Sequence, residues 1–230
     1  MFNTGLVDQL YDPIYAWFGK NEKREGGWIF RQFVKSSDRE MQTLTRIFGT
    51  NMPETAHYYN STSELVYDIR RDIGSYNWDH FVQRCDRLPI GFLKDNGPAF
   101  DYDRKEKNAQ FYKELSIAIQ NDKSSYKRIK DRIIDAINNA LKRVKWNFKT
   151  AIPIYYPGQR AISLLLPLAL TDGETIDCAL VLESTDSNAY IAHTILTLKM
   201  AYNDARLITR PDSDWLVANK ISDVSTNMTV

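Results

Sequence analysis

The chain has 230 residues, of which 43% are hydrophobic and 26% are charged, and its net charge at pH 7 is +1. A chain of this length can bury a sizeable core, and its 13 tyrosines, 10 phenylalanines and 5 tryptophans exclude an intrinsically disordered protein. With 10 glycines and 8 prolines, it is neither collagen-like nor of low complexity.

Several features bear on the compartment. Residues 1–5 have neither the basic end nor the apolar core of a signal peptide. The longest apolar run, Leu164–Leu170, is far shorter than the roughly 20 residues that a membrane-spanning helix needs. Cys85 and Cys178 have no Cys or His partner at metal-ligand spacing, which is typical of reduced, buried thiols. We therefore expect a cytoplasmic protein that contacts no membrane.

The first 49 residues predict a β-hairpin and a helix. Aromatic and β-branched residues favour strands over residues 11–18 and 28–34, and a charged, glycine-bounded loop joins them. Ser37 and Asp38 offer an N-cap for a short helix that ends before Gly49.

The pattern is less regular between residues 50 and 104. Residues 65–69 favour a strand, with a helix as the alternative, and residues 77–88 favour a helix that Pro89 ends. Residues 94–104 are the most loop-like stretch and mark the place where a weak subdivision of the chain is expected.

The remainder predicts two helices, four strands and a closing helix. In the second helix, apolar residues recur every three or four positions. The strand around Leu180 is apolar on both faces, which predicts a central place in the sheet. The expected helices are 105–121, 125–148 and 200–207, and the expected strands are 152–156, 161–170, 176–183 and 190–198. The whole pattern predicts a single α+β domain over residues 1–230, with a mainly antiparallel sheet packed against a long helical region.

The charge is unevenly distributed along the chain. Residues 104–149 carry 13 basic and 5 acidic side chains, whereas the segments before and after them are net acidic. No Asp or Glu occurs from residue 138 to residue 149. Such an excess of positive charge favours a polyanionic partner.

Eight short blocks of the sequence resemble a bacterial family of domains of unknown function. They span nearly the whole chain, and the most specific is the last. The blocks are 2–7, 13–16, 28–30, 77–80, 155–158, 165–168, 179–181 and 194–207. Members of this family are often fused to cold-shock domains or to OST-type winged-helix RNA-binding domains, so the resemblance implies an RNA-related role. It assigns no catalytic residues, and because no cold-shock-like sequence precedes Phe2, we expect this chain to be the domain alone.

The basic helical segment is the first candidate site. Its cations fall mostly away from the apolar face, where they would release counterions from RNA or another polyanion. Trp146 and Phe148 lie among them and would stack on bases, or else belong to the core. The alternative is an ordinary solvated helix face. The candidate nucleic-acid-binding residues are Lys127, Arg128, Lys142, Arg143, Lys145, Trp146, Lys149, Tyr156 and Arg160.

A polar set in the last third is the second candidate site. If Asp177, Glu183, His193 and Arg206 converged on one pocket, they would suit an enzyme acting on nucleotides or RNA ends. The alternative for isolated acids at strand ends is simple solvation. A third hypothesis is a protein-interaction module, self-associating through an exposed sheet edge as a homo-oligomer.

The three histidines complete the candidates. His57, His80 and His193 are scattered, without the spacing of metal ligands, so we expect no metal and no cofactor. His80 would act as a general base only if the fold brought it a partner, and a structural or surface histidine is the alternative. The alternation of His193 with Ile191 and Ile195 predicts an inward side chain.

Overall fold

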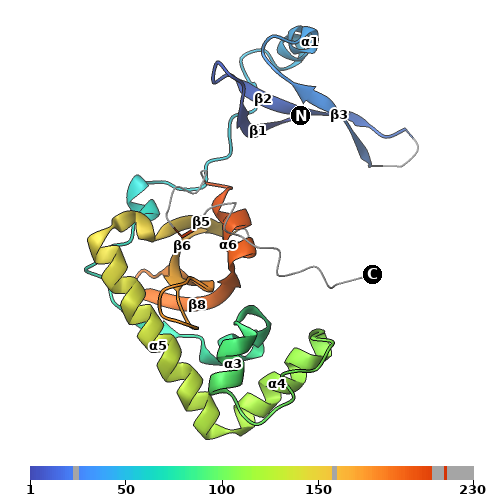
Figure 1. Ribbon diagram of the computed structural model, residues 1–230. Coiled ribbons are helices and arrows are strands. Elements are labelled where there is room, and N and C mark those ends of the chain that lie inside the picture. Colours follow the sequence, from blue (N-terminus) through green and yellow to red (C-terminus); the bar gives the residue numbers. More distant parts are fainter. Residues whose placement is uncertain (23–25, 157–159, 209–214, 217–230) are drawn as a thin grey trace. The chain divides into compact units, whose positions relative to one another are not determined.

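The computed structural model describes residues 1–22, 26–156, 160–208 and 215–216 (Figure 1). The chain divides into two compact units, Met1–His57 and Tyr58–Val230. Helices and mainly antiparallel strands are both present, which confirms the predicted α+β class. Residues 94–104, where a weak subdivision is expected from the sequence, lie inside the second unit.

The first unit is a three-stranded antiparallel sheet with one helix. Its elements are β1 (Phe2–Val7), β2 (Pro13–Lys20), β3 (Trp28–Val34) and α1 (Arg39–Phe48). The predicted hairpin and helix are confirmed, and Gly49 ends α1 with its backbone N–H on the Thr45 carbonyl. Strand β1 is an addition to the prediction, because Gly5 in the left-handed region (φ +72°) and a register shift interrupt its pattern.

The second unit is built on a five-stranded mixed sheet. In the order β4-β8-β7-β6-β5, every neighbouring pair is antiparallel except β4 with β8. Strand β7 is central, as its apolar sequence predicts. The strands are β4 (Ile73–Tyr76), β5 (Ile152–Tyr156), β6 (Ala161–Leu168), β7 (Cys178–Ser184) and β8 (Tyr190–Thr197).

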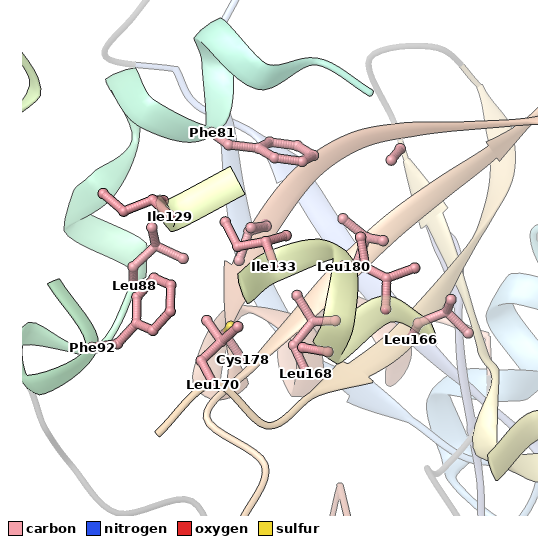
Figure 2. Close-up of a cluster of buried hydrophobic side chains, with 14 of the residues drawn as sticks. Phe81, Leu88, Phe92, Ile129, Ile133, Leu166, Leu168, Leu170, Cys178 and Leu180 are labelled. Carbon is pink, nitrogen blue, oxygen red and sulfur yellow. The ribbon is translucent and has the colours of Figure 1, made fainter. Parts of the chain in front are cut away.

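Helices cover both faces of this sheet. On one face, Ile129, Ile133 and Ile137 of α5 pack with Leu166 and Leu180 in the larger core cluster (Figure 2). On the other face, α6 buries two alanines against a smaller cluster. The helical elements are η1 (Thr62–Leu65), α2 (Trp78–Gln83), η2 (Cys85–Arg87), α3 (Ile90–Asn96), α4 (Ala109–Asn121), α5 (Lys123–Trp146), η3 (Phe148–Thr150) and α6 (Leu198–Ala205).

Two local predictions were wrong. Residues 65–69 are not a strand. Ile69 is 62% exposed, and the segment is held to Tyr190 by the stacking of Tyr67, with ring centroids 4.8 Å apart, and by a 2.9 Å hydrogen bond from the Asp68 N–H to the Tyr190 hydroxyl. The loop expected over 94–104 begins later, since α3 continues to Asn96 with Phe92 buried beneath it.

The structure also bears on membrane association and metal binding. Within the described ranges, no helix has both the length and the apolar character that crossing a bilayer requires. The same residues contain no group of three or more His, Cys, Asp or Glu side chains placed to share a metal ion. Cys85 and Cys178 are buried and unbridged, and burial raises the pKa of the Cys85 thiol to about 12.

Candidate functional site

The C-terminal end of α5 combines exposed aromatic rings with cations. Trp146 is 93% exposed and Phe148 is 60% exposed, which is unusual for rings of this size. Lys142 and Arg143 precede Trp146 by four and three positions, so they are its neighbours on the helix surface. Lys145 is exposed beside them. We call these five residues the α5 tip.

The positive charge of the α5 tip is not neutralised by contact ion pairs. Among the described residues, no carboxylate lies within 4.0 Å of Lys142, Arg143 or Lys145. The Lys142 Nζ instead donates to the Asn139 side-chain oxygen at 3.4 Å, and Arg143 donates to the Gly173 carbonyl at 3.3 Å. The tip therefore retains three positive charges at the surface.

Other predicted nucleic-acid-binding residues lie elsewhere. Arg128 donates to the backbone carbonyls of Asn96 and Gly97, at 3.0 and 3.2 Å, and so satisfies the C-terminal end of α3. Lys127 is exposed, but 19 residues of helix separate it from Trp146, which is about 28 Å along the axis. Lys127 and Arg128 therefore lie near the other end of α5, on a part of the surface that is separate from the α5 tip.

The last three predicted residues follow the helix. Lys149 is exposed in η3, directly after the tip. Arg160 is exposed at the start of the next described range and has a positive φ of 53°. Tyr156 ends β5, and its ring centroid lies 6.2 Å from that of His193. Tyr156 therefore belongs to a different group of side chains.

That group forms around His193 in β8. The Nδ1 atom of His193 lies 3.7 Å from a carboxylate oxygen of Glu183 in the adjacent strand β7. Val181 pairs with Thr194 and Leu182 pairs with Ala192, so His193 is the extra residue of a β-bulge. Because the bulge breaks the alternation of the strand, His193 is 33% exposed at its side chain instead of pointing wholly inward.

Residues of α2 and η2 complete the group around His193, at the point where the edge strand β4 ends. Strand β4 pairs only with residues 190–192 of β8, and α2 and η2 flank the rest of the strand. His80 of α2 makes a 3.0 Å hydrogen bond from Nε2 to the Thr194 hydroxyl. Arg87 of η2 donates to the same hydroxyl at 2.8 Å and to the Ile195 carbonyl at 2.9 Å.

The two imidazoles therefore approach each other from different elements. The ring centroids of His80 and His193 lie 6.2 Å apart. We call the group the polar cluster and define it as His80, Arg87, Tyr156, Glu183, His193 and Thr194. The structure thus gives His80 two partners: Thr194, and Arg87, which the sequence did not single out. No local signal marks these two, since more than 100 residues separate them along the chain.

Burial shapes the electrostatics of the polar cluster. It is the main cause of a lowered pKa at His80, to which the positive charge of Arg87 adds. Burial also lowers the pKa of Arg87. It raises the pKa of Asp204 in α6, an effect that Arg87 opposes. The cluster thus favours neutral His80 beside a half-buried guanidinium.

The lowered pKa makes a prediction for stability. Unfolded chains protonate histidine near pH 6.5, and the folded chain protonates His80 only at lower pH. The unfolded state thus binds more protons, and the contribution of His80 is complete above about pH 6.5 and declines as the pH falls. We expect His80→Asn to flatten the fall of the unfolding free energy between pH 7 and pH 5, measured by urea denaturation. Equal slopes for the variant and the native chain would contradict this account.

The remaining predicted catalytic residues do not join the polar cluster through any contact of the described residues. Asp177 precedes β7 and accepts hydrogen bonds from the backbone N–H groups of Leu170 and Thr171, at 2.6 and 3.0 Å. Six residues of strand separate it from Glu183, or about 20 Å. Arg206 follows α6 and lies over the Tyr202 ring at 5.7 Å. Of the four, the structure brings together Glu183 and His193.

Two surface depressions of the first unit hold none of the candidate nucleic-acid-binding or catalytic residues, although the scattered His57 lines the second. One follows α1 from Ser36 to Arg46, and the other lies between β1 and the segment that ends at His57. The α5 tip and the polar cluster, both in the second unit, thus remain the candidate sites.

The fold and these two sites define an α+β protein with one cationic, aromatic surface and one imidazole–guanidinium cluster. Residues 1–215 match a family described as a domain of unknown function, DUF3825, and the chain belongs to this family. No curated protein and no solved structure matched the chain.

Proposed function

We propose that the chain is an RNA-associated binding domain and that the α5 tip is its contact with single-stranded RNA. The observation that carries this proposal is the nearly complete exposure of Trp146 among three cations that have no carboxylate partner within the described residues. A large exposed ring costs solvation free energy that a stacked base would recover.

The two parts of the tip have different roles in this proposal. Lys142, Arg143 and Lys145 attract phosphates and release their counterions, which provides affinity without sequence preference. Trp146 and Phe148 offer faces on which bases stack, at about 1–3 kcal/mol for each base. The tip therefore suits an unpaired strand, whose bases are free to stack, better than a duplex.

The family resemblance supports the same class of ligand. That resemblance implies fusion of related domains to cold-shock or OST-type RNA-binding modules, which supports an RNA ligand for this domain. In this proposal the α5 tip contributes a general, salt-sensitive contact, and a fused or separate module contributes sequence preference. The rival enzyme hypothesis uses the polar cluster, and the self-association hypothesis uses an exposed sheet edge of the protein.

Fluorescence anisotropy with a labelled single-stranded RNA tests the proposal. We expect binding at low salt that weakens with rising salt, and Lys142→Glu/Lys145→Glu should weaken it at least tenfold. The slope of log K against log salt should fall by one to two, since about 0.7 is lost for each phosphate contact. Trp146→Ala should weaken binding about fivefold or more, whereas Trp146→Phe should retain most of it.

The matched control changes the same charge at the other end of the same helix. Lys123→Glu/Lys127→Glu alters two exposed lysines that lie more than about 25 Å from Trp146 along the axis. This variant should lose less affinity than the tip variant at every salt concentration. The proposal fails if the native chain does not bind RNA at low salt, or if the two double variants lose affinity equally.

A further inference from the structure

Arg87 holds a positive charge that forms no contact ion pair among the described residues, although Asp86 and Asp204 act on it from longer range. Both of its hydrogen bonds leave from one terminal nitrogen and end on neutral oxygens, those of Thr194 and Ile195. Its Nε atom is shielded from solvent and has no acceptor among the described residues. No carboxylate of those residues lies within 4.0 Å of the guanidinium. A half-buried charge without a carboxylate in direct contact is costly, so an anion that reached it would be stabilised.

Two imidazoles stand beside this charge in a suitable arrangement. The ring centroids of His80 and His193 lie 6.2 Å apart, a separation at which both rings can donate an N–H group to one anion, at about 2.8 Å each. Glu183 faces Nδ1 of His193, which leaves Nε2 to contact a ligand. The Thr194 hydroxyl occupies Nε2 of His80, which leaves Nδ1.

The neighbouring side chains favour a tetrahedral anion that carries an organic group. A phosphate has several acceptor oxygens, enough for a guanidinium edge and two imidazoles together, and arginine is well suited to it. Tyr156, exposed at its ring and 6.2 Å from His193, offers a face for the group attached to the phosphorus. A carboxylate has two acceptor oxygens, whereas a phosphoryl group can place a separate oxygen on each of these donors.

We propose that the polar cluster is a binding site for a phosphoryl group, of the kind found on a mononucleotide or at the end of an RNA strand. Binding of the phosphoryl group rests on the cluster alone. Its extension to RNA ends rests on the proposed function of the α5 tip.

Phosphoryl binding should couple to the protonation of His80. Besides burial, the pKa of His80 is lowered by three neighbouring groups, those of Arg87, His193 and Arg84. The carboxylate of Asp86 acts in the opposite direction. A bound phosphoryl group adds two negative charges and offsets the cations, so it should raise the pKa of His80. Binding then takes up a proton, and affinity should rise as the pH falls from 8 towards 6.5.

Histidine resonances in an NMR titration report this directly. We expect inorganic phosphate and adenosine 5′-monophosphate to shift the ring signals of His80 and His193 and to raise the pKa of His80, while adenosine leaves both unchanged. Arg87→Gln should weaken phosphate binding at least tenfold, and Arg87→Lys, which keeps the charge, should weaken it less. His193→Gln provides a second variant if Arg87→Gln does not fold, and it too should weaken binding.

Two further experiments distinguish phosphoryl binding from general RNA binding, and the phosphoryl site from the α5 tip. A short RNA with a 5′-phosphate should shift both histidines more than the same RNA with a 5′-hydroxyl. The α5 tip variant Lys142→Glu/Lys145→Glu should retain its response to inorganic phosphate, even if RNA binding is lost. The inference is overturned if phosphate at tens of millimolar leaves the ring signals of the native chain unchanged, or if adenosine shifts them equally.

Discussion

Replacing Leu180 with alanine should lower the unfolding free energy of the second unit by about 3 kcal/mol, within the range of 2–5 typical of buried Leu→Ala changes. Leu180 is fully buried in the central strand β7. It pairs with Leu166 on one side and Ile195 on the other, both buried, and α5 packs on the same face (Figure 2). Because neighbours fix the site on every side, the protein cannot collapse into the space that the side chain leaves.

Urea denaturation followed by far-UV circular dichroism measures this loss. Ile117→Ala is the control, since it removes a similar side chain from an exposed position of α4 and should change the free energy by less than about 0.5 kcal/mol. If the alanine variant does not fold, Leu180→Val should still cost about 1 kcal/mol. A loss at Leu180 no larger than that at Ile117 would contradict the central place of β7 in the core.

Asp177→Ala should cost about 2–3 kcal/mol of stability. The carboxylate accepts hydrogen bonds from the Leu170 and Thr171 backbone N–H groups and from the Thr171 hydroxyl at 3.0 Å. These bonds hold the turn between β6 and β7 closed, and bonds to a charged acceptor contribute about 1.5–3 kcal/mol each, without full additivity. Asp177, a candidate catalytic residue from the sequence, would thus act on the fold.

The control is Asp186→Ala, which removes an exposed carboxylate from the turn between β7 and β8. It should change the unfolding free energy by less than about 0.5 kcal/mol. Asp177→Asn should fall between the two, since an amide keeps one acceptor oxygen but lacks the charge. A stability loss at Asp177 equal to that at Asp186 would refute the role in the turn.

Much of the secondary structure could be predicted from the sequence, because the patterns that indicate helices and strands are local. The helix that became α5 repeats its apolar residues every three or four positions, and the strand around Leu180 is apolar on both faces. Each signal needs only the residues of its own segment. The prediction failed where tertiary contacts decide: β4 is four residues long and exists through its pairing with β8.

The polar cluster shows the same limit more sharply. The sequence left open whether Glu183 and His193 converge, and the pairing of β7 with β8 is what brings them together. Arg87 and His80 reach the same place from helical segments more than 100 residues earlier, and nothing in their own sequence marks the destination. The exposure of Trp146 was likewise open, since the sequence allowed both a surface and a core position. Only the packing of α5 on β6 decides which face meets solvent.

The bulge in β8 frees one position from the constraints of its neighbours. Val181 pairs with Thr194 and Leu182 pairs with Ala192. His193, which lies between these two partners, pairs with no residue of β7. Evolution can therefore exchange the side chain at that point, altering what the surface recognises, while the scaffold on either side stays intact. A substitution at this position would therefore change the chemistry of the surface without changing the pairing of the sheet.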